Sequence, residues 1–495
     1  MKDNGYETHM IGKWHIGSYT HLHVPSQRGF DTFMGYLNDE EMYWTHQSWS
    51  AQLNGRKFFD FGFGNATGYY DIIDRPIPDH PRNGSVDDDA GAEDELSQTS
   101  SVSSSVSETS NTFRGRYSTE LFHNRAIDIL EEKTPWDEEP LYMYLAHQAV
   151  HDPLGLPPNG SFSPEEEAIL DAIEADSDDD GHLRKRFAKV LMFLDQTIGE
   201  MMGYLEEKGW MENSIIMVAS DNGGCPSTGG SNYPLRGVKH SYWEGGLKVP
   251  AFVYSQSHIP EARWGSEYYG AMHVTDWLPT LATGAGLELT GAAGVFDGID
   301  QWEYIVNGDL TKYDKFASPR EEMMYNFDPY ILWIGTGDSF DNAEYNLAQG
   351  AFRSGKYKYL ASEWCSGWYT FNLRVLGSDS LTNVTTACGG SPCSDCGQGC
   401  TEYNYTDYLF DLEADPREET NLIEVYPDLA HSMRERWVEL AFSEYADSIY
   451  ESIDHEAYYV WAKYNWWMVP WWGQVGKSTE DSSSGLNSTT SEGGS

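Results

Sequence analysis

The chain has little positive charge and no long apolar segment. Lysine and arginine number 32 against 78 aspartate and glutamate residues, which gives a formal net charge of -46 at pH 7. Proteins that bind nucleic acids need a surplus of cations to replace phosphate counterions, so this balance argues against a nucleic-acid partner. No apolar run approaches the roughly 20 residues that span a bilayer, and no membrane segment is expected. The opening residues, Met1 to Asn4, lead directly into polar sequence and do not resemble a signal peptide.

Cysteine is scarce, with six residues in the chain of 495. Five of them lie late in the sequence, at spacings compatible with a zinc site or with disulfide bonds: Cys365, Cys388, Cys393, Cys396 and Cys400. Six N-glycosylation sequons suggest a glycoprotein that is secreted or lies in the lysosomal or endomembrane lumen, where disulfides are favoured over a zinc site. The sequons begin at Asn65, Asn83, Asn159, Asn383, Asn404 and Asn487. Because these features occur without a signal peptide, we expect the natural N-terminus to lie upstream of Met1.

Apolar periodicity predicts alternating helices and strands. Apolar side chains from Phe187 to Leu205 recur at steps of three and four, as in an amphipathic helix. A second helix is predicted from Tyr117 to Lys133, with Ser118 or Thr119 as its cap. The remaining predicted elements are strands at Leu141–Ala146 (of buried type), Ser214–Ala219, Val249–Tyr254 and Ala351–Leu360, and helices at Val274–Ala282 and Leu429–Phe442.

This order predicts two domains. Alternating helices and strands over residues 1–310 indicate an α/β domain with a mostly parallel central sheet. Residues 311–477 are expected to form a smaller C-terminal α+β domain. Two acidic segments, 84–112 and 164–181, are interpreted as solvated surface insertions, the first of them disordered, and the Ser/Gly-rich tail 478–495 is expected to be disordered.

Two segments place basic side chains where they could meet an anion. Residues two apart in an extended chain point the same way, so Lys13 and His15 of Gly12–Gly17 would project together. A fixed cation beside a titratable imidazole could hold an anionic oxygen and pass it a proton. Lys239 lies in the loop Asn232–Gly246, where a flexible backbone could bring its ammonium to an anion. The alternatives are a surface lysine with a structural histidine, and a solvated lysine.

Polar residues also follow two predicted strands directly. His151 comes just past the strand 141–146, and Asp221 and Asn222 follow the strand that ends at Ala219. Open α/β sheets bind their ligands at the carboxyl ends of the strands. Carboxylate and amide oxygens suit Ca²⁺ or Mg²⁺. A hydrogen-bonded loop histidine and an ordinary Asp-Asn-Gly turn are the alternatives.

The order and content of these segments resemble the type I sulfatases, and in particular the arylsulfatase B-like branch. The matching segments of the larger domain are Gly12–Gly17, Arg28–Asp31 with Gly35–Tyr36, Ala149–Pro153, Ser220–Gly224 and Pro234–Gly246. In the smaller domain, Gly355–Lys358 and Leu409–Leu412 are similar to that branch. The resemblance implies an alkaline-phosphatase-like sulfatase fold. It also implies a sulfuric ester hydrolase that acts on sulfate monoesters, either those of a sulfated polysaccharide or aryl sulfates.

By position, the resemblance also assigns roles. Lys13, His15, His151 and Lys239 would grip sulfate and handle protons, while Asp221 and Asn222 would be two ligands of one Ca²⁺ ion. The family's nucleophile is a formylglycine, made by the formylglycine-generating enzyme within a Cys/Ser-x-Pro-x-Arg motif upstream of the Gly12–Gly17 segment, and two further aspartate ligands lie beyond it.

Neither the nucleophile motif nor the two further aspartates is present here. After Cys225 the proline comes one place early and no arginine follows. We therefore expect this chain by itself to be inactive. One alternative is a catalytically inactive relative that binds sulfated glycans. Another is a phosphoryl hydrolase of the same superfold, which the Pro234–Gly246 segment disfavours.

Overall fold

The computed structural model describes eleven ranges: residues 1–18, 20–50, 56–65, 68–70, 113, 115–175, 181–289, 297–307, 318–328, 348–363 and 406–443. The expected insertion at 84–112, the tail 478–495 and the five late cysteines lie outside them. Within the described part of the chain, no helix is both long and apolar enough to cross a membrane.

A parallel core of three strands forms the centre of the larger domain. β1 (Glu7–Lys13) pairs in parallel with β2 (Thr32–Tyr36) on one side and with β7 (Leu141–Ala146) on the other. Two short antiparallel strands, β5 (Gly62–Asn65) and β6 (Gly68–Tyr70), extend the sheet beyond β2. Separate antiparallel pairs are formed by β3 (Gln47–Ser50) with β4 (Arg56–Phe59), and by β8 (Ile216–Ala219) with β9 (Ala251–Tyr254).

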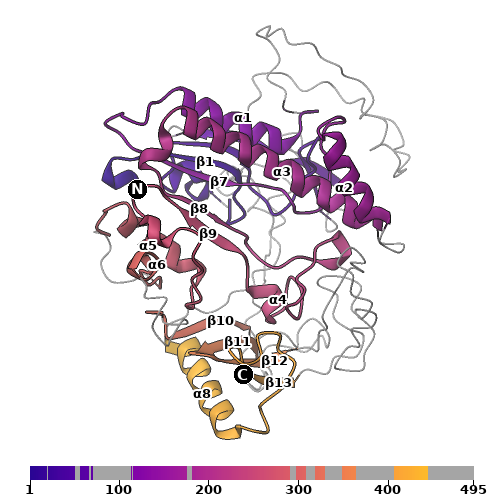
Figure 1. Cartoon of the computed structure of the whole chain (residues 1–495), viewed down its shortest axis with the longest axis vertical. Coiled ribbons are helices and arrows are strands. Elements are labelled where there is room, and N and C mark those ends of the chain that lie inside the picture. Colours follow the sequence, from indigo (N-terminus) through magenta and orange to yellow (C-terminus); the bar gives the residue numbers. More distant parts are fainter. Residues whose placement is uncertain are drawn as a thin grey trace, which may run out of the picture.

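Helices cover the sheet. In Figure 1, α1 (Ser118–Glu131) and α3 (Gly181–Glu207) lie next to the part of the sheet that contains β1 and β7. The apolar face of α1, including Leu121 and Phe122, packs on Ile11 and Met34 of the sheet in one core cluster. Short helices α4 (Glu244–Leu247), α5 (Trp277–Gly284) and α6 (Trp302–Asn307) follow β8, as the alternating pattern predicts.

Two predictions about helices are wrong in detail. The α1 N-cap is Tyr117, without a side-chain cap bond, because the Ser118 hydroxyl instead donates to Gln148 Oε1 at 2.6 Å. The acidic segment 164–181 is not merely a solvated stretch, because it contains the helix α2 (Pro164–Ala175), which packs on α3. Ser163 and Glu166 bond to each other's backbone N–H at the start of α2, and Leu170 is fully buried.

The strand Leu141–Ala146 was expected to be buried, and it is only partly so. Tyr144 of β7 is 48% exposed, and Phe252 of β9 is 55% exposed. Among the described strands, β7 pairs with β1 alone and β8 pairs with β9 alone, so one edge of each is unpaired. Tyr144 and Phe252 thus both lie on strands that have a neighbouring strand on one side only.

The smaller domain is an antiparallel sheet covered by one helix. Strands β10 (Glu322–Asp328), β11 (Gln349–Ser354), β12 (Tyr357–Glu363) and β13 (Thr406–Asp411) lie in sequential order, and α8 (Pro427–Ser443) buries Trp437 against them. The single strand expected at 351–360 is in fact a hairpin, because Gly355 takes a left-handed φ of 54° and turns the chain. Figure 1 shows this domain at one end of the molecule.

Candidate anion site

The candidate site begins where the parallel strands end. Lys13 is the last residue of β1, and β1 and β7 are in register with Gly12 opposite Ala146. Gly12 has a φ of 105°, and a Cβ built on it would lie 1.9 Å from the Ala146 carbonyl oxygen. Only glycine therefore allows β1 and β7 to approach this closely. The residues that follow, Lys13 on one strand and the loop from His147 on the other, consequently leave the same edge of the sheet.

Lys239 and His151 are in direct contact across 88 residues of sequence. Lys239 Nζ lies 2.9 Å from His151 Nε2. His151 Nδ1 lies 2.6 Å from the Asp152 carbonyl oxygen, which can only accept a hydrogen bond. The proton is therefore assigned to Nδ1, and Nε2 accepts from the Lys239 ammonium. Tyr43 Oη donates to the His151 carbonyl at 2.9 Å and holds this loop in place.

Lys13 and His15 share the electrostatic environment of that pair. Burial lowers the pKa of Lys13, and the nearby Lys239 ammonium lowers it further. Burial also lowers the pKa of His15, followed by the charge of Lys13, with smaller effects from His151 and Lys239. The pKa of His151 is lowered by burial, and by Lys239 and Lys13. The structure thus brings together the four basic residues expected from the sequence, and burial and neighbouring positive charge lower the pKa values of Lys13, His15 and His151.

Asp221 and Asn222 form a tight turn after β8. Asp221 Oδ1 accepts from the Asn222 N–H at 2.8 Å, and Asn222 Nδ2 donates to the Gly223 carbonyl at 3.0 Å. The carboxylate of Asp221 acts on Lys13 by raising its pKa, so this turn borders the basic cluster. Calcium takes six to eight oxygen ligands. Among the described residues, no group of three or more His, Cys, Asp or Glu side chains could hold a metal ion. Asp221 and Asn222 by themselves do not complete a calcium site.

Sequence reasoning missed an acidic border of the cluster. Asp39 and Glu40 follow β2, the third strand that ends at this edge, and both carboxylates act to raise the pKa of Lys13. The pKa of Glu40 is itself raised, first by burial and then by Asp39 and Asp152. The signal was available in the sequence, since the run Asp39-Glu40-Glu41 follows the Gly35-Tyr36 segment after only two residues.

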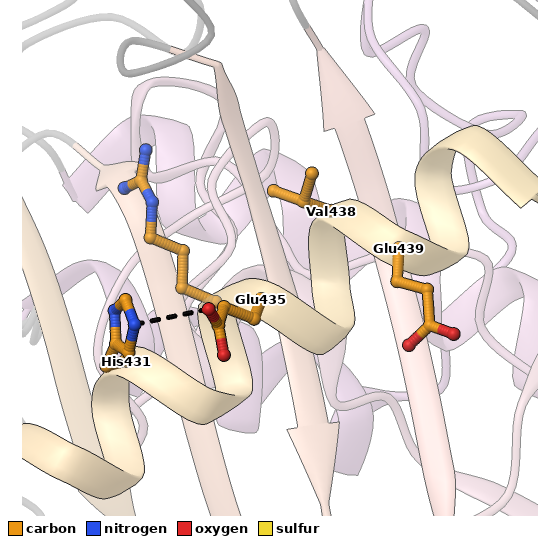
Figure 2. Close-up of a pocket in the computed structure, with 5 residues that line it drawn as sticks. His431, Glu435, Val438 and Glu439 are labelled. Carbon is orange, nitrogen blue, oxygen red and sulfur yellow. Dashed lines mark ion pairs between the residues drawn. The ribbon is translucent and has the colours of Figure 1, made fainter.

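A surface depression on α8 lies elsewhere and does not compete with this cluster. Figure 2 shows its lining, with His431 and Glu435 paired one turn apart. His431 Nε2 lies 3.2 Å from Glu435 Oε1, and Arg434 bonds to Asp407 at 3.1 Å. Because its charges are already paired on the smaller domain, this depression offers no unneutralised charge to a ligand.

Cys225 takes part in a disulfide bond. The other five cysteines lie outside the described residues. The sequence pattern pointed to disulfides among the late cysteines but gave no role to Cys225. A disulfide sulfur is neither a thiolate nor a free nucleophile, so Cys225 cannot attack a substrate in this state.

Comparison with solved structures defines the class of fold. The chain is similar to Ps i-CgsB, a crystal structure in complex with k-i-k-neocarrahexaose, with a TM-score of 0.57 and 18% sequence identity over 93% of this chain and 77% of that one. It is also similar to PsFucS1 sulfatase from Pseudoalteromonas sp., with a TM-score of 0.51 and 18% identity over 90% of this chain and 73% of that one. The fold is the alkaline-phosphatase-like α/β fold of these proteins, as the sequence resemblance implied.

Comparison of sequences then identifies the family. Residues 1–287 match the sulfatase family model, and the chain belongs to the sulfatase family. It is 31% identical over 446 residues to arylsulfatase J of Mus musculus, covering 88% of this chain and 60% of that protein. It is 23% identical over 316 residues to N-acetylgalactosamine-6-sulfatase of Sus scrofa, covering 63% of this chain and 48% of that protein. The chain therefore spans between about half and three fifths of the length of these relatives.

Proposed function

We propose that this chain carries the sulfate-binding part of a sulfuric ester hydrolase that acts on sulfate monoesters. The observation that carries the proposal is the contact between Lys239 and His151 beside Lys13, in a protein with a net charge of -46. Burial and the Lys239 ammonium lower the pKa of Lys13, so its charged form is stabilised when an anion arrives between the two lysines. A sulfate monoester, whose charge spreads over its non-bridging oxygens, is such an anion.

The chemistry of each residue follows from its surroundings. The Lys13 and Lys239 ammonium groups would hold the non-bridging oxygens and stabilise the charge that develops during transfer. His151 Nε2 is the ring atom open to proton exchange, because Nδ1 donates to the Asp152 carbonyl. Burial, followed by the charge of Lys13, lowers the pKa of His15 and so favours its neutral form. A bound anion would raise the pKa of both imidazoles and favour the protonated forms, which could deliver a proton to the leaving oxygen.

The nucleophile in this proposal is a formylglycine outside the present chain, produced by the formylglycine-generating enzyme. Support comes from β7 and β8, since each leaves one edge unpaired among the described strands, with Tyr144 exposed beside β7. A further strand would satisfy those backbone groups. We also propose that two aspartates from the same missing segment complete a calcium site with Asp221 and Asn222, and that the ion would neutralise sulfate oxygens.

The proposed substrate is a sulfated carbohydrate, with aryl sulfates as artificial substrates. The names of the relatives support this class, since one acts on N-acetylgalactosamine-6-sulfate and one solved structure holds a neocarrahexaose. A secreted or lysosomal location is proposed as well, because Cys225 is disulfide-bonded and disulfides form and persist mainly in oxidising compartments. The second candidate function is binding of sulfated glycans without catalysis, which the contact of Lys239 with His151 beside Lys13 would also support.

Hydrolysis of a chromogenic aryl sulfate tests the proposal. This chain alone should show no turnover, while a version extended by its natural upstream segment and co-expressed with the formylglycine-generating enzyme should be active. On the extended background, Lys239→Ala and His151→Ala should each lower kcat by about 10²–10³-fold. Lys248→Ala, an exposed lysine in the following segment, is the matched control and should leave kcat unchanged.

Two results would contradict this scheme. Turnover by the short chain that is abolished by substituting His15 would mean that the nucleophile lies within these residues. An extended chain with verified formylglycine and bound calcium that fails to turn over sulfated oligosaccharides, yet binds them, would establish the binding function instead.

A further inference from the structure

A buried lysine of the smaller domain lies at the back of the loop that carries Lys239. Lys358, on β12, is fully buried, and its Nζ donates to Glu244 Oε1 at 2.8 Å and to Glu418 Oε1 at 2.9 Å. Glu418 is fully buried and Glu244 is 5% exposed. Glu244 belongs to the larger domain, so this three-residue cluster, Lys358–Glu244–Glu418, joins the two domains.

The cluster holds both sides of the Lys239 loop. Glu418 Oε2 accepts from the Glu244 backbone N–H at 2.7 Å, on the C-terminal side of Lys239. The Glu418 carbonyl accepts from Arg236 Nη1 at 2.9 Å, on the N-terminal side. The Arg236 guanidinium lies 3.6 Å from the ring centroid of Trp243, which closes the loop on itself. One residue of the smaller domain thus fixes the loop before and after Lys239.

Backbone contacts carry this restraint to the candidate site. The Gly245 N–H donates to the Arg236 carbonyl at 2.6 Å, and the Gly223 N–H donates to the Gly246 carbonyl at 3.0 Å. The Lys239 N–H donates to the Gly224 carbonyl at 3.2 Å. A Cβ on Gly223 would lie 1.8 Å from the Gly245 carbonyl oxygen, so these segments have no room to shift independently. A movement of Glu244 would therefore displace the backbone of Lys239.

The buried charges of the cluster make its structure depend on the Lys358 ammonium. Burial raises the pKa of Glu418 to about 7, against the attraction of Lys358, and the Lys358 ammonium contributes to lowering the pKa of Glu244. Removing the lysine would leave two buried carboxyl groups without the ammonium that hydrogen-bonds to both of them. An unpaired buried charge is costly, so the two segments would separate or take up protons, and the loop would relax.

We propose that Lys358 is a positioning residue of the sulfate site, which sets the place of Lys239 against His151 through Glu244 and Glu418. The inference rests on the proposed function, because it concerns the same site. Lys358 touches no reacting group, and its effect is transmitted through the loop. The chain offers a matched control two residues earlier, in the turn just before β12, since Lys356 pairs at the surface with Asp411.

The test uses this chain, inorganic sulfate as the probe, and the ring signals of His151 in NMR spectra. Lys358→Met should weaken sulfate binding by about 2- to 30-fold, the range for residues that act on a site without touching its ligand. Lys239 helps to lower the pKa of the His151 imidazole, so this pKa should rise both in Lys239→Ala and in Lys358→Met. Lys356→Met, with the same loss of charge, should change neither quantity.

A second variant covers the case in which Lys358→Met does not fold. Substituting Glu244→Gln and Glu418→Gln in addition removes the buried charge imbalance while keeping the volumes, and cooperative thermal unfolding verifies the fold. Weaker sulfate binding and a raised His151 pKa in either folded variant support the positioning role. Wild-type values in a folded variant overturn it, and loss of folding in both overturns it too, because Lys358 is then purely structural.

Failure of the proposed function gives a different pattern. If Lys239→Ala leaves sulfate binding unchanged, the sulfate site itself is misassigned and the positioning role falls with it. If Lys239→Ala weakens binding and the folded Lys358 variants do not, only the positioning role is lost.

Discussion

Replacing Gly12 by alanine should damage both the sheet and the site. The new Cβ would lie 1.9 Å from the Ala146 carbonyl oxygen and 2.6 Å from its carbon, with φ at 105°. Left-handed backbone costs a residue with a side chain about 1–2 kcal/mol. Relief of the overlap adds about 1–3 kcal/mol, and the disturbed hydrogen bond between β1 and β7 adds about 1 kcal/mol. We expect a loss of about 3–6 kcal/mol in the free energy of unfolding.

Urea denaturation measures this loss, and Gly5→Ala is its control. Gly5 has a similar left-handed φ of 82° just before β1, but a Cβ there meets nothing within 4 Å. It should therefore lose only the backbone term of about 1–2 kcal/mol. Gly12→Ala should also weaken sulfate binding, because Lys13 is the next residue. Equal destabilisation of the two variants would refute the reasoning that close approach of β1 and β7, rather than backbone conformation, requires this glycine.

Three further outcomes are expected. Calorimetry on this chain should find no tight calcium site, because Asp221 and Asn222 provide too few ligands, and tight binding would reveal ligands not recognised here. Burial raises the pKa of Asp60 from 3.8 to about 7, so between these pH values the folded state binds more protons than the unfolded state. The stability of the fold should therefore fall as pH rises from about 4 to 7. Asp60→Asn should flatten this fall when urea denaturation is followed at several pH values. Burial lowers the pKa of His147 from 6.5 to about 4. The stability that the buried neutral imidazole contributes is therefore fully present above pH 6.5 and is lost as pH falls toward 4, by about 3 kcal/mol in total. If the pH dependence of the free energy of unfolding is unchanged in His147→Gln, this reasoning is contradicted.

The local elements were predictable because their signals are local. The apolar period around Phe187–Leu205 lies within α3, and the apolar runs ending at Ala146 and Ala219 end where β7 and β8 end. That Lys13, His15, His151 and Lys239 lie close together was also predictable, since they come from strand ends and glycine-rich segments, while their roles stay a prediction. Periodicity and turn chemistry suffice where neighbours in sequence decide the conformation.

What the sequence could not predict depends on partners distant along the chain. Ser118 was a reasonable cap, but Gln148, 30 residues away, takes its hydroxyl. Lys358 sits in an alternating strand and would be interpreted as a surface lysine, yet Glu244 and Glu418 bury it. Asp60 is buried because the Leu37 and Asn38 N–H groups bond to its carboxylate. Such tertiary pairing overrides the usual preference of charged residues for the surface.

The basic cluster lies within an acidic protein, and this contrast has a kinetic consequence. In the proposed site, Lys13 and Lys239 would attract an anion over a few ångströms, while Asp39, Glu40 and the net charge of -46 would repel it at longer range. Salt screens the long-range field, with a Debye length of about 8 Å at physiological ionic strength, and leaves contacts inside the site less affected. A highly sulfated polymer should therefore associate faster as salt is added from low concentration, the reverse of the behaviour of a basic polyanion-binding surface.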